Sequence, residues 1–120
     1  MAKVIAIDVD GTLLTQVGQK GAIPPAYLGE WLPDAKEAMR LLKSNGFTIR
    51  IMTGRIWHGF PNWQEQLALL KCRFEDDMVP YDSFESKVGD ATVFIDDLAI
   101  PFLNNWGEIV RRLVDQRNAL

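Results

Sequence analysis

The chain has 120 residues, the size of one domain, and its balance of 48% hydrophobic and 24% charged residues excludes a disordered protein. Its formal net charge of -3, with Lys and Arg scattered along the chain, disfavours extended nucleic acid as a partner, because phosphate neutralisation supplies most of that affinity. No apolar stretch is long enough to span a bilayer, and the single cysteine, Cys72, cannot form an internal disulfide, so we expect a cytoplasmic protein with no membrane partner.

In chain order, the first predicted element is a strand over 3–7, a continuous apolar run rich in β-branched residues. Segment 15–32 follows, and its glycines and prolines make it too irregular for a helix. It is long for a connection in so small a domain, so we expect a functional loop or flap beside a ligand site. An apolar stripe predicts a helix over 33–43 with Gly46 as its stop, and a second buried strand is predicted over 47–52.

The second half continues the alternation of strands and helices. Asn62, with a glutamate three residues later, forms a capping pair that predicts a helix over 62–70. A weak strand pattern lies at 78–81, a third strong one at 91–95, and a last helix is predicted over 106–114. This alternation predicts a single α/β domain, a three-layer Rossmann-like fold whose central parallel sheet is covered on both faces.

Two pairs of aspartates follow predicted strands. Asp8 and Asp10 come where the first strand ends, and Asp96 and Asp97 follow the third strong strand. If these two strands are neighbours in a parallel sheet, the four carboxylates converge at one edge and repel each other unless a cation neutralises them. A hard divalent ion with oxygen ligands, Mg²⁺, is the economical partner for such a cluster.

A hydroxyl and a lysine extend the pattern. Thr53 and Gly54 follow the second strand, where a hydroxyl and bare N–H groups at a strand-to-helix turn can bind phosphate. Lys87 lies before the third strong strand and is expected to supply a fixed positive charge, with Lys43 and Lys71 as alternatives. Because each group lies at or near a strand's end, their convergence predicts phosphoryl transfer.

The order of these groups resembles the haloacid dehalogenase-like hydrolase superfamily, whose members are mostly phosphatases. Its first motif is similar to residues 8–12, Asp-Val-Asp-Gly-Thr, and its second to the Thr53 that ends an apolar strand. Its third motif is similar to Lys87 and its fourth to Asp96-Asp97. The similarity covers essentially the whole chain, and it implies a covalent aspartyl-phosphate mechanism.

The resemblance also implies a role for each acidic residue. Asp8 would attack phosphorus, and Asp10 would protonate the leaving alkoxide and later activate water. Magnesium would be held by Asp8, the backbone carbonyl of Asp10, and Asp96, with Asp97 assisting directly or through a bound water. Charge compensation by Mg²⁺ and Lys87 would allow an anionic nucleophile to approach a phosphate dianion.

Members of this superfamily usually carry a cap domain over the site. Here the first insertion point holds only loop 15–32, and the second, 56–78, is mostly needed for a helix and a short strand. The sequence therefore predicts a capless member with an open site. We expect a small phosphorylated substrate that covers the cleft itself, or a homo-oligomer whose neighbour acts as the lid.

Three residues after the second strand are candidates for substrate contact, namely Arg55, Trp57 and His58. Arg55 either forms a local salt bridge or reaches a substrate anion. Trp57 and His58 either form a stacking patch for substrate or hold their own loop in place. For Trp63, packing in the core is the preferred interpretation.

The favoured function is a magnesium-dependent phosphomonoesterase that acts on a small phosphorylated metabolite. A phosphatase acting on polynucleotide strand ends is a further enzymatic option. A receiver-like signalling module is an alternative, although receivers place their phosphoacceptor Asp after a middle strand, where this chain has Thr53. A catalytically retired binding protein is the remaining alternative.

Overall fold

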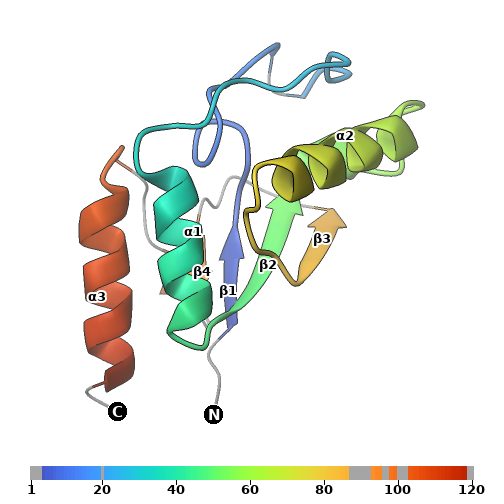
Figure 1. The fold of residues 1–120 in the computed structure, drawn as a ribbon. Coiled ribbons are helices and arrows are strands. Elements are labelled where there is room, and N and C mark those ends of the chain that lie inside the picture. Colours follow the sequence, from blue (N-terminus) through green and yellow to red (C-terminus); the bar gives the residue numbers. More distant parts are fainter. Residues whose placement is uncertain (1–3, 20, 87–92, 96–97, 100–102, 119–120) are drawn as a thin grey trace.

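The computed structural model describes residues 4–19, 21–86, 93–95, 98–99 and 103–118. Its elements in chain order are β1 (Val4–Ile7), α1 (Ala35–Ser44), β2 (Thr48–Thr53), the 3-10 helix η1 (Gly54–Ile56), α2 (Trp63–Asp76), β3 (Ser83–Ser86), β4 (Val93–Ile95), β5 (Leu98–Ala99) and α3 (Trp106–Asn118). Figure 1 shows the strands in one sheet, with the helices in front of it and the loop between β1 and α1 passing above the strand ends. The predicted α/β class is confirmed.

The sheet has the strand order β3-β2-β1-β4-β5. Its strands β1, β2 and β3 are parallel, with Ile7 paired to Ile51 and Thr53 paired to Ser86. Helices α1 and α2 connect these three strands in turn, which is the βαβ pattern of Rossmann-like folds. The carboxyl ends of the three parallel strands therefore meet at one edge of the sheet.

Strand β4 departs from the prediction that all strong strands are parallel. It is a neighbour of β1, which was the condition for the aspartates to converge, but it runs antiparallel to β1, with Val93 opposite Ile7 and Ile95 opposite Ile5. Only residues 87–92 separate β3 from β4, fewer than the dozen or so that a crossover between parallel strands needs. The carboxyl end of β4 thus lies toward the amino end of β1, away from the edge where Asp8 follows β1.

One face of the sheet carries the core. Ile5 and Ile7 of β1 and Ile49 and Ile51 of β2 are fully buried, whereas the alternate residues of both strands are partly buried or exposed. Figure 1 shows α1, α2 and α3 on one side of the sheet, and α1 contacts both α3 and β2. Coverage of both faces is predicted from the sequence, but a second helical layer is not among the described elements.

Helix α2 and the segment after it differ from the prediction in detail. The helix continues six residues beyond residue 70. Asn62 occupies its N-cap position but makes no side-chain cap bond, because its amide donates to the Pro24 carbonyl instead. The strand predicted over 78–81 is wrong, since Met78 has a φ of 54° and its N–H continues the helix end by donating to the Glu75 carbonyl.

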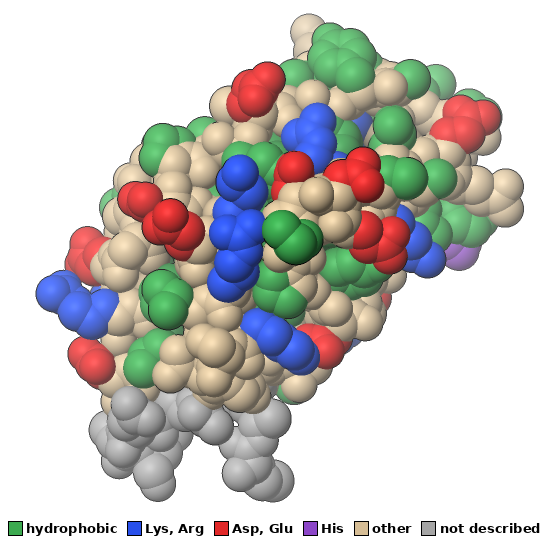
Figure 2. All heavy atoms as spheres, viewed as in Figure 1, with side chains coloured by type: hydrophobic (Ala, Val, Ile, Leu, Met, Phe, Trp, Pro, Cys, Tyr) green, Lys and Arg blue, Asp and Glu red, His purple; other side chains and the backbone are tan. Residues whose placement is uncertain are grey.

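The described residues contain neither a second folded unit that would form a cap nor a helix with both the length and the apolar character to cross a bilayer. On the face seen in Figure 2, acidic and basic side chains are interspersed, and apolar groups are scattered among them. The charge of this face therefore has no single sign.

Candidate functional site

The register of β1 and β2 places two predicted site residues at the same edge of the sheet. Because Ile7 pairs with Ile51, Asp8 follows β1 beside the end of β2, where Thr53 is the last strand residue. Both side chains are buried, with exposures of 7% for Asp8 and 1% for Thr53. One carboxylate oxygen of Asp8 accepts the N–H of Val9 at 2.8 Å.

A tight turn follows Asp8 and orients Asp10. The Val9 carbonyl oxygen accepts N–H groups from residues 12, 13 and 14, and Gly11 supplies the positive φ of 80° that the turn requires. The indole N–H of Trp106, from α3, donates to the Thr12 carbonyl at 2.9 Å. The turn is therefore fixed both by its own backbone and by the last helix.

The Asp10 side chain is engaged by Arg55, which lies in η1 directly after β2. The Arg55 Nε donates to one carboxylate oxygen at 2.8 Å, and its Nη2 donates to the other at 2.9 Å. The side-chain exposures are 3% for Arg55 and 16% for Asp10. Of the two roles considered for Arg55, the structure contains the local salt bridge.

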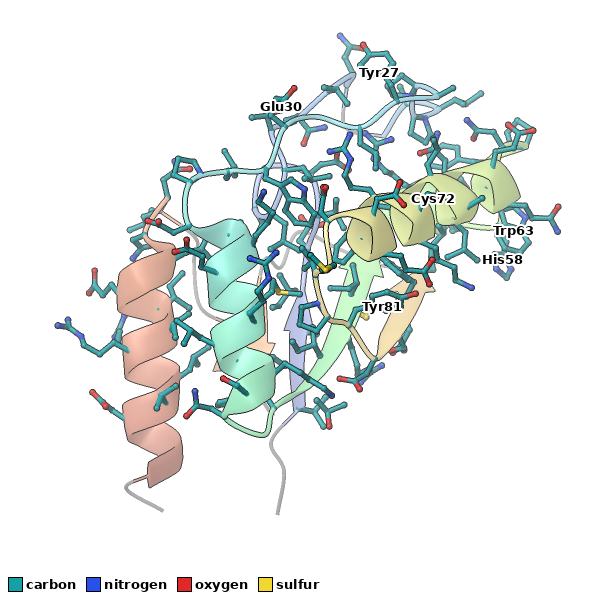
Figure 3. The ribbon with its side chains drawn as sticks, viewed as in Figure 1. Tyr27, Glu30, His58, Trp63, Cys72 and Tyr81 are labelled. Atoms are coloured by element: carbon teal, nitrogen blue, oxygen red, sulfur yellow. The ribbon has the colours of Figure 1, made fainter. Side chains whose placement is uncertain are left out.

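The other end of the Arg55 guanidinium holds the loop between β1 and α1. Its Nη1 donates to the Gln66 Oε1 at 2.7 Å and to the carbonyls of Tyr27 at 3.2 Å and Pro25 at 3.3 Å. Gln66, from α2, also donates to the Pro25 carbonyl at 2.7 Å. Figure 3 shows Tyr27 on this loop above the carboxyl ends of β1 and β2. The described part of loop 15–32 therefore lies over the carboxyl ends of β1 and β2.

The base of loop 15–32 is also fixed. The N–H of Thr15 donates to the Glu30 carbonyl at 2.8 Å, and the N–H of Glu30 donates back to the Thr15 Oγ1 at 3.0 Å. Arg73 of α2 donates to the Gly29 carbonyl at 2.7 Å. These contacts close the loop into one compact segment held against α2.

The aromatic residues after β2 form two contacts of their own. His58 stacks on Trp63 with ring centroids 4.1 Å apart, and Figure 3 shows the pair at the start of α2. Trp57 is 52% exposed and meets Phe60 edge-to-face at 5.1 Å. Trp63 is half-buried and is not part of the core cluster, so the expectation of a core position for it is wrong. The exposed ring of Trp57 is therefore available to a ligand.

The predicted metal site is only partly covered by the described residues. Asp96, Asp97 and Lys87 lie outside them, and the antiparallel direction of β4 does not support the expected convergence of strand ends. Within the described ranges, no three His, Cys, Asp or Glu side chains gather in one place. The donors present, the Asp8 carboxylate and the Asp10 backbone carbonyl, are hard oxygens that fit Mg²⁺ in kind but form an incomplete set.

Sequence reasoning missed Gln66, which links Arg55 to the loop. Gln66 is fully buried and lies four residues before Leu70, which in turn lies four residues before Phe74 on the buried face of α2. A polar residue on an otherwise apolar helical stripe indicates a buried hydrogen-bonding group. That spacing was the available signal.

Comparisons with known proteins bear on the fold. A scan against family models finds no match, and no curated protein matches the chain. A target protein from Vibrio cholerae has a similar structure, with 22% identity and a TM-score of 0.59 over 96% of this chain and 98% of that chain. A conserved protein from Bacteroides thetaiotaomicron shows 20% identity and a TM-score of 0.52 over 97% of this chain and 93% of its own. At these identities the similarity shows the fold alone.

Proposed function

We propose that this chain is a cytoplasmic, magnesium-dependent phosphomonoesterase that acts on a small phosphorylated metabolite through an aspartyl-phosphate on Asp8. The observation that carries the proposal is the register of β1 and β2, which places Asp8, the Asp10 turn and Thr53 at one edge under loop 15–32. The exposed thiol of Cys72 suits a reducing compartment.

In the first step, an Asp8 carboxylate oxygen forms a bond to phosphorus while the ester bond breaks. The departing alkoxide takes a proton from the Asp10 carboxyl group. In the second step, the Asp10 carboxylate removes a proton from water, the water oxygen attacks phosphorus, and Asp8 is regenerated as inorganic phosphate leaves. The covalent intermediate replaces one difficult displacement with two easier ones.

Thr53 and Gly54 are the proposed phosphate contacts. The Thr53 Oγ1 accepts a hydrogen bond from the backbone N–H of Arg55 at 3.1 Å, so the Thr53 hydroxyl proton points away from that bond and can be donated to a phosphate oxygen. A Cβ on Gly54 would meet no heavy atom within 4 Å, so its backbone is open to a ligand on that side. Lys87 is the proposed cationic partner of the phosphoryl oxygens.

The Asp8 carboxylate and the Asp10 backbone carbonyl would hold Mg²⁺. Asp96 and Asp97, the further ligands expected from the sequence, follow β4, whose carboxyl end lies away from this edge, so their part in the site is what the Asp96→Asn titration below tests. When bound, the ion supplies charge neutralisation between the anionic nucleophile and the phosphate. We propose that loop 15–32, which lies over this edge, takes the place of a cap.

One observation favours a second function. Both Asp10 carboxylate oxygens accept hydrogen bonds from Arg55, so the proposed general acid is occupied in this conformation. A protein that binds phosphate esters without turning them over would retain such an arrangement. The two functions differ in whether the phosphoryl group becomes bonded to Asp8.

The deciding experiment uses an aryl phosphate and an alkyl phosphate with wild type, Asp8→Asn and Asp10→Asn. Asp8→Asn should abolish turnover of both substrates, because an amide cannot form the aspartyl-phosphate. Asp10→Asn should release a stoichiometric burst of phenol from the aryl ester and retain the phosphoryl group, because aryl leaving groups need little protonation but hydrolysis still needs a base. With the alkyl ester neither burst nor turnover should occur.

Intact-mass measurement and peptide mapping identify the phosphorylated residue. A label on Asp8 supports the phosphatase, and a label on any other residue contradicts it. Binding of both esters by wild type with no turnover at any magnesium concentration would establish the binding protein instead. In a thermal-shift titration, Asp96→Asn should respond less to Mg²⁺ than wild type, and equal responses would exclude Asp96 as a ligand.

A further inference from the structure

We propose that Arg55 is a positioning residue that couples the placement of Asp10 to the docking of loop 15–32. The structural part of the proposed coupling rests on the contacts of Arg55, and the catalytic part rests on the proposed phosphatase function. Arg55 takes no part in bond making. It sets Asp10 in place only while the loop is closed, so the loop controls the proton-transfer group of the site.

The geometry of the guanidinium carries this inference. Its Nε and Nη2 face Asp10, and its Nη1 faces the opposite way, toward Gln66 and the carbonyls of Pro25 and Tyr27. The guanidinium group is planar and rigid, so these two sets of contacts cannot be adjusted independently. A shift of the loop therefore changes the direction of the N–H groups that hold Asp10.

Burial makes the coupling energetically significant. Arg55 is 4% exposed, and loop carbonyls accept hydrogen bonds from its Nη1. A buried guanidinium needs both a counter-charge and partners for its N–H groups. Asp10 supplies the counter-charge, and the loop carbonyls accept hydrogen bonds from the guanidinium. Loss of Asp10 therefore weakens the hold of Arg55 on the loop, and loss of the loop contacts weakens its hold on Asp10.

Gln66 closes the network from the side of α2. Its Oε1 accepts from Arg55, and its Nε2 donates to the Pro25 carbonyl at 2.7 Å, so Arg55, Gln66 and Pro25 form a closed triangle of hydrogen bonds. Gln66 is fully buried. Its side chain bonds to Arg55 and to the loop carbonyls of Pro24 and Pro25, so it reaches Asp10 through Arg55.

The coupling has a defined consequence for the proposed reaction. Arg55 holds both carboxylate oxygens of Asp10 in one fixed place, and the second step requires a base that is fixed beside the water it activates. A variant without this hold should form the aspartyl-phosphate from an aryl ester but hydrolyse it slowly. Such a variant should resemble Asp10→Asn although its Asp10 is intact.

The structural part is tested by amide hydrogen exchange of peptides covering 22–30, measured by mass spectrometry. We expect Asp10→Asn and Arg55→Met to raise exchange in this segment by about tenfold or more. Arg55→Met removes the guanidinium that the loop carbonyls bind, and Asp10→Asn removes the counter-charge that keeps this guanidinium in place. The matched control is Arg50→Met, which removes an arginine of β2 that pairs with Glu85 on β3 and should leave exchange at 22–30 unchanged. Loop exchange in Asp10→Asn equal to that of wild type would overturn the coupling.

Gln66→Leu provides a second variant, in case loss of the buried pair prevents folding. It keeps Asp10 and Arg55 but removes the α2 side of the triangle, so loop exchange should again rise. Arg55→Lys keeps the charge without the planar fork, and it should not restore the wild-type exchange. Restoration by lysine would show that charge alone suffices and would contradict the positioning role.

The catalytic part is tested by rapid-mix assays with the aryl phosphate. Arg55→Met and Gln66→Leu should show a phenol burst and accumulate phosphorylated Asp8, whereas Arg50→Met should show the steady release of wild type. A uniform loss of rate without accumulation would overturn the catalytic part. If wild type hydrolyses no phosphate ester, the proposed function fails while hydrogen exchange still decides the coupling. An active wild type with an uncoupled loop would refute this inference alone.

Discussion

Two arginine–carboxylate pairs, one with its arginine in β2 and one with its arginine in η1, use the same chemistry in different surroundings. Arg50 of β2 donates through Nε and Nη2 to both oxygens of Glu85 on β3, and Arg55 donates through the same two nitrogens to both oxygens of Asp10. The first pair has side-chain exposures of 43% and 35%, and the second has 3% and 16%. Among the described residues, a loop covers the second pair and not the first.

The difference in exposure changes what each pair contributes. Exposed pairs typically contribute about 0–1 kcal/mol, because water screens the charges and holding long side chains still costs entropy. A buried pair requires both charges to leave water, so its value lies more in fixing an arrangement than in net stability. The Arg50–Glu85 salt bridge therefore joins the neighbouring strands β2 and β3, whereas the Arg55–Asp10 salt bridge fixes the arrangement of the candidate site.

The largest expected effect comes from removing one carboxylate of each pair. Asp10→Ala leaves Arg55 buried without a counter-charge and should lower the free energy of unfolding by about 3–5 kcal/mol. Glu85→Ala exposes an arginine that is already half in water and should cost about 0.2–1 kcal/mol. Urea unfolding followed by circular dichroism measures both values. Equal losses for the two variants would remove the distinction between the pairs.

A smaller effect should follow from opening the cover of the buried pair. A Cβ on Gly29 would lie 2.2 Å from the Thr15 Oγ1 and 2.3 Å from the Thr15 carbonyl oxygen, so Gly29→Ala must separate the two sides of the loop base. We expect a loss of about 1–3 kcal/mol, together with hydration of Arg55. Gly107→Ala is the control, because a Cβ there meets nothing within 4 Å. Unfolding midpoints that are the same for Gly29→Ala and Gly107→Ala would contradict the clash.

The smallest expected effect is the loss of stability from the exposed Arg50–Glu85 pair as the pH is lowered. Hydrogen bonding from Arg50 is the largest influence on the Glu85 carboxyl and lowers its pKa from 4.5 to about 2. A lowered folded-state pKa stabilises the protein above pH 4.5, and this contribution is lost as the pH falls toward 2. The stability difference between wild type and Glu85→Gln should therefore shrink over that range. Because the pair is substantially exposed, the total change should stay below about 1 kcal/mol. A difference that grows with acid would have the wrong sign.

The sequence predicted the elements that have strong apolar patterns and missed those that depend on partners. β1, β2 and the three helices were recognisable because each has enough apolar residues at a clear period. β3, with the sequence Ser-Phe-Glu-Ser, has one apolar residue, and it forms a strand because it pairs with β2 and ties Glu85 to Arg50. The predicted direction of β4 was wrong because a run of apolar residues indicates a buried strand but not whether that strand is parallel or antiparallel to its neighbour.

The candidate site was predictable where a residue's position follows from a strand end. Asp8 and Thr53 fall at one edge because β1 and β2 are parallel neighbours, which the alternation of elements already indicated. The role of Arg55 was undetermined, because it depends on where loop 15–32 docks. Gln66 was missed for the same reason, since its partners are loop carbonyls that no side-chain motif reveals.

The hydrogen bond from the Trp106 indole to the Thr12 carbonyl joins residues that are 94 positions apart. During synthesis on a ribosome, Trp106 is added roughly 5–20 s after the turn that carries Asp10, at ordinary elongation rates. Until then the turn has its local backbone bonds and the contacts of Asp10 with Arg55. The candidate site of a nascent chain therefore waits for helix α3, and a truncation before Trp106 should leave the turn after Asp8 without the indole N–H that the Thr12 carbonyl accepts.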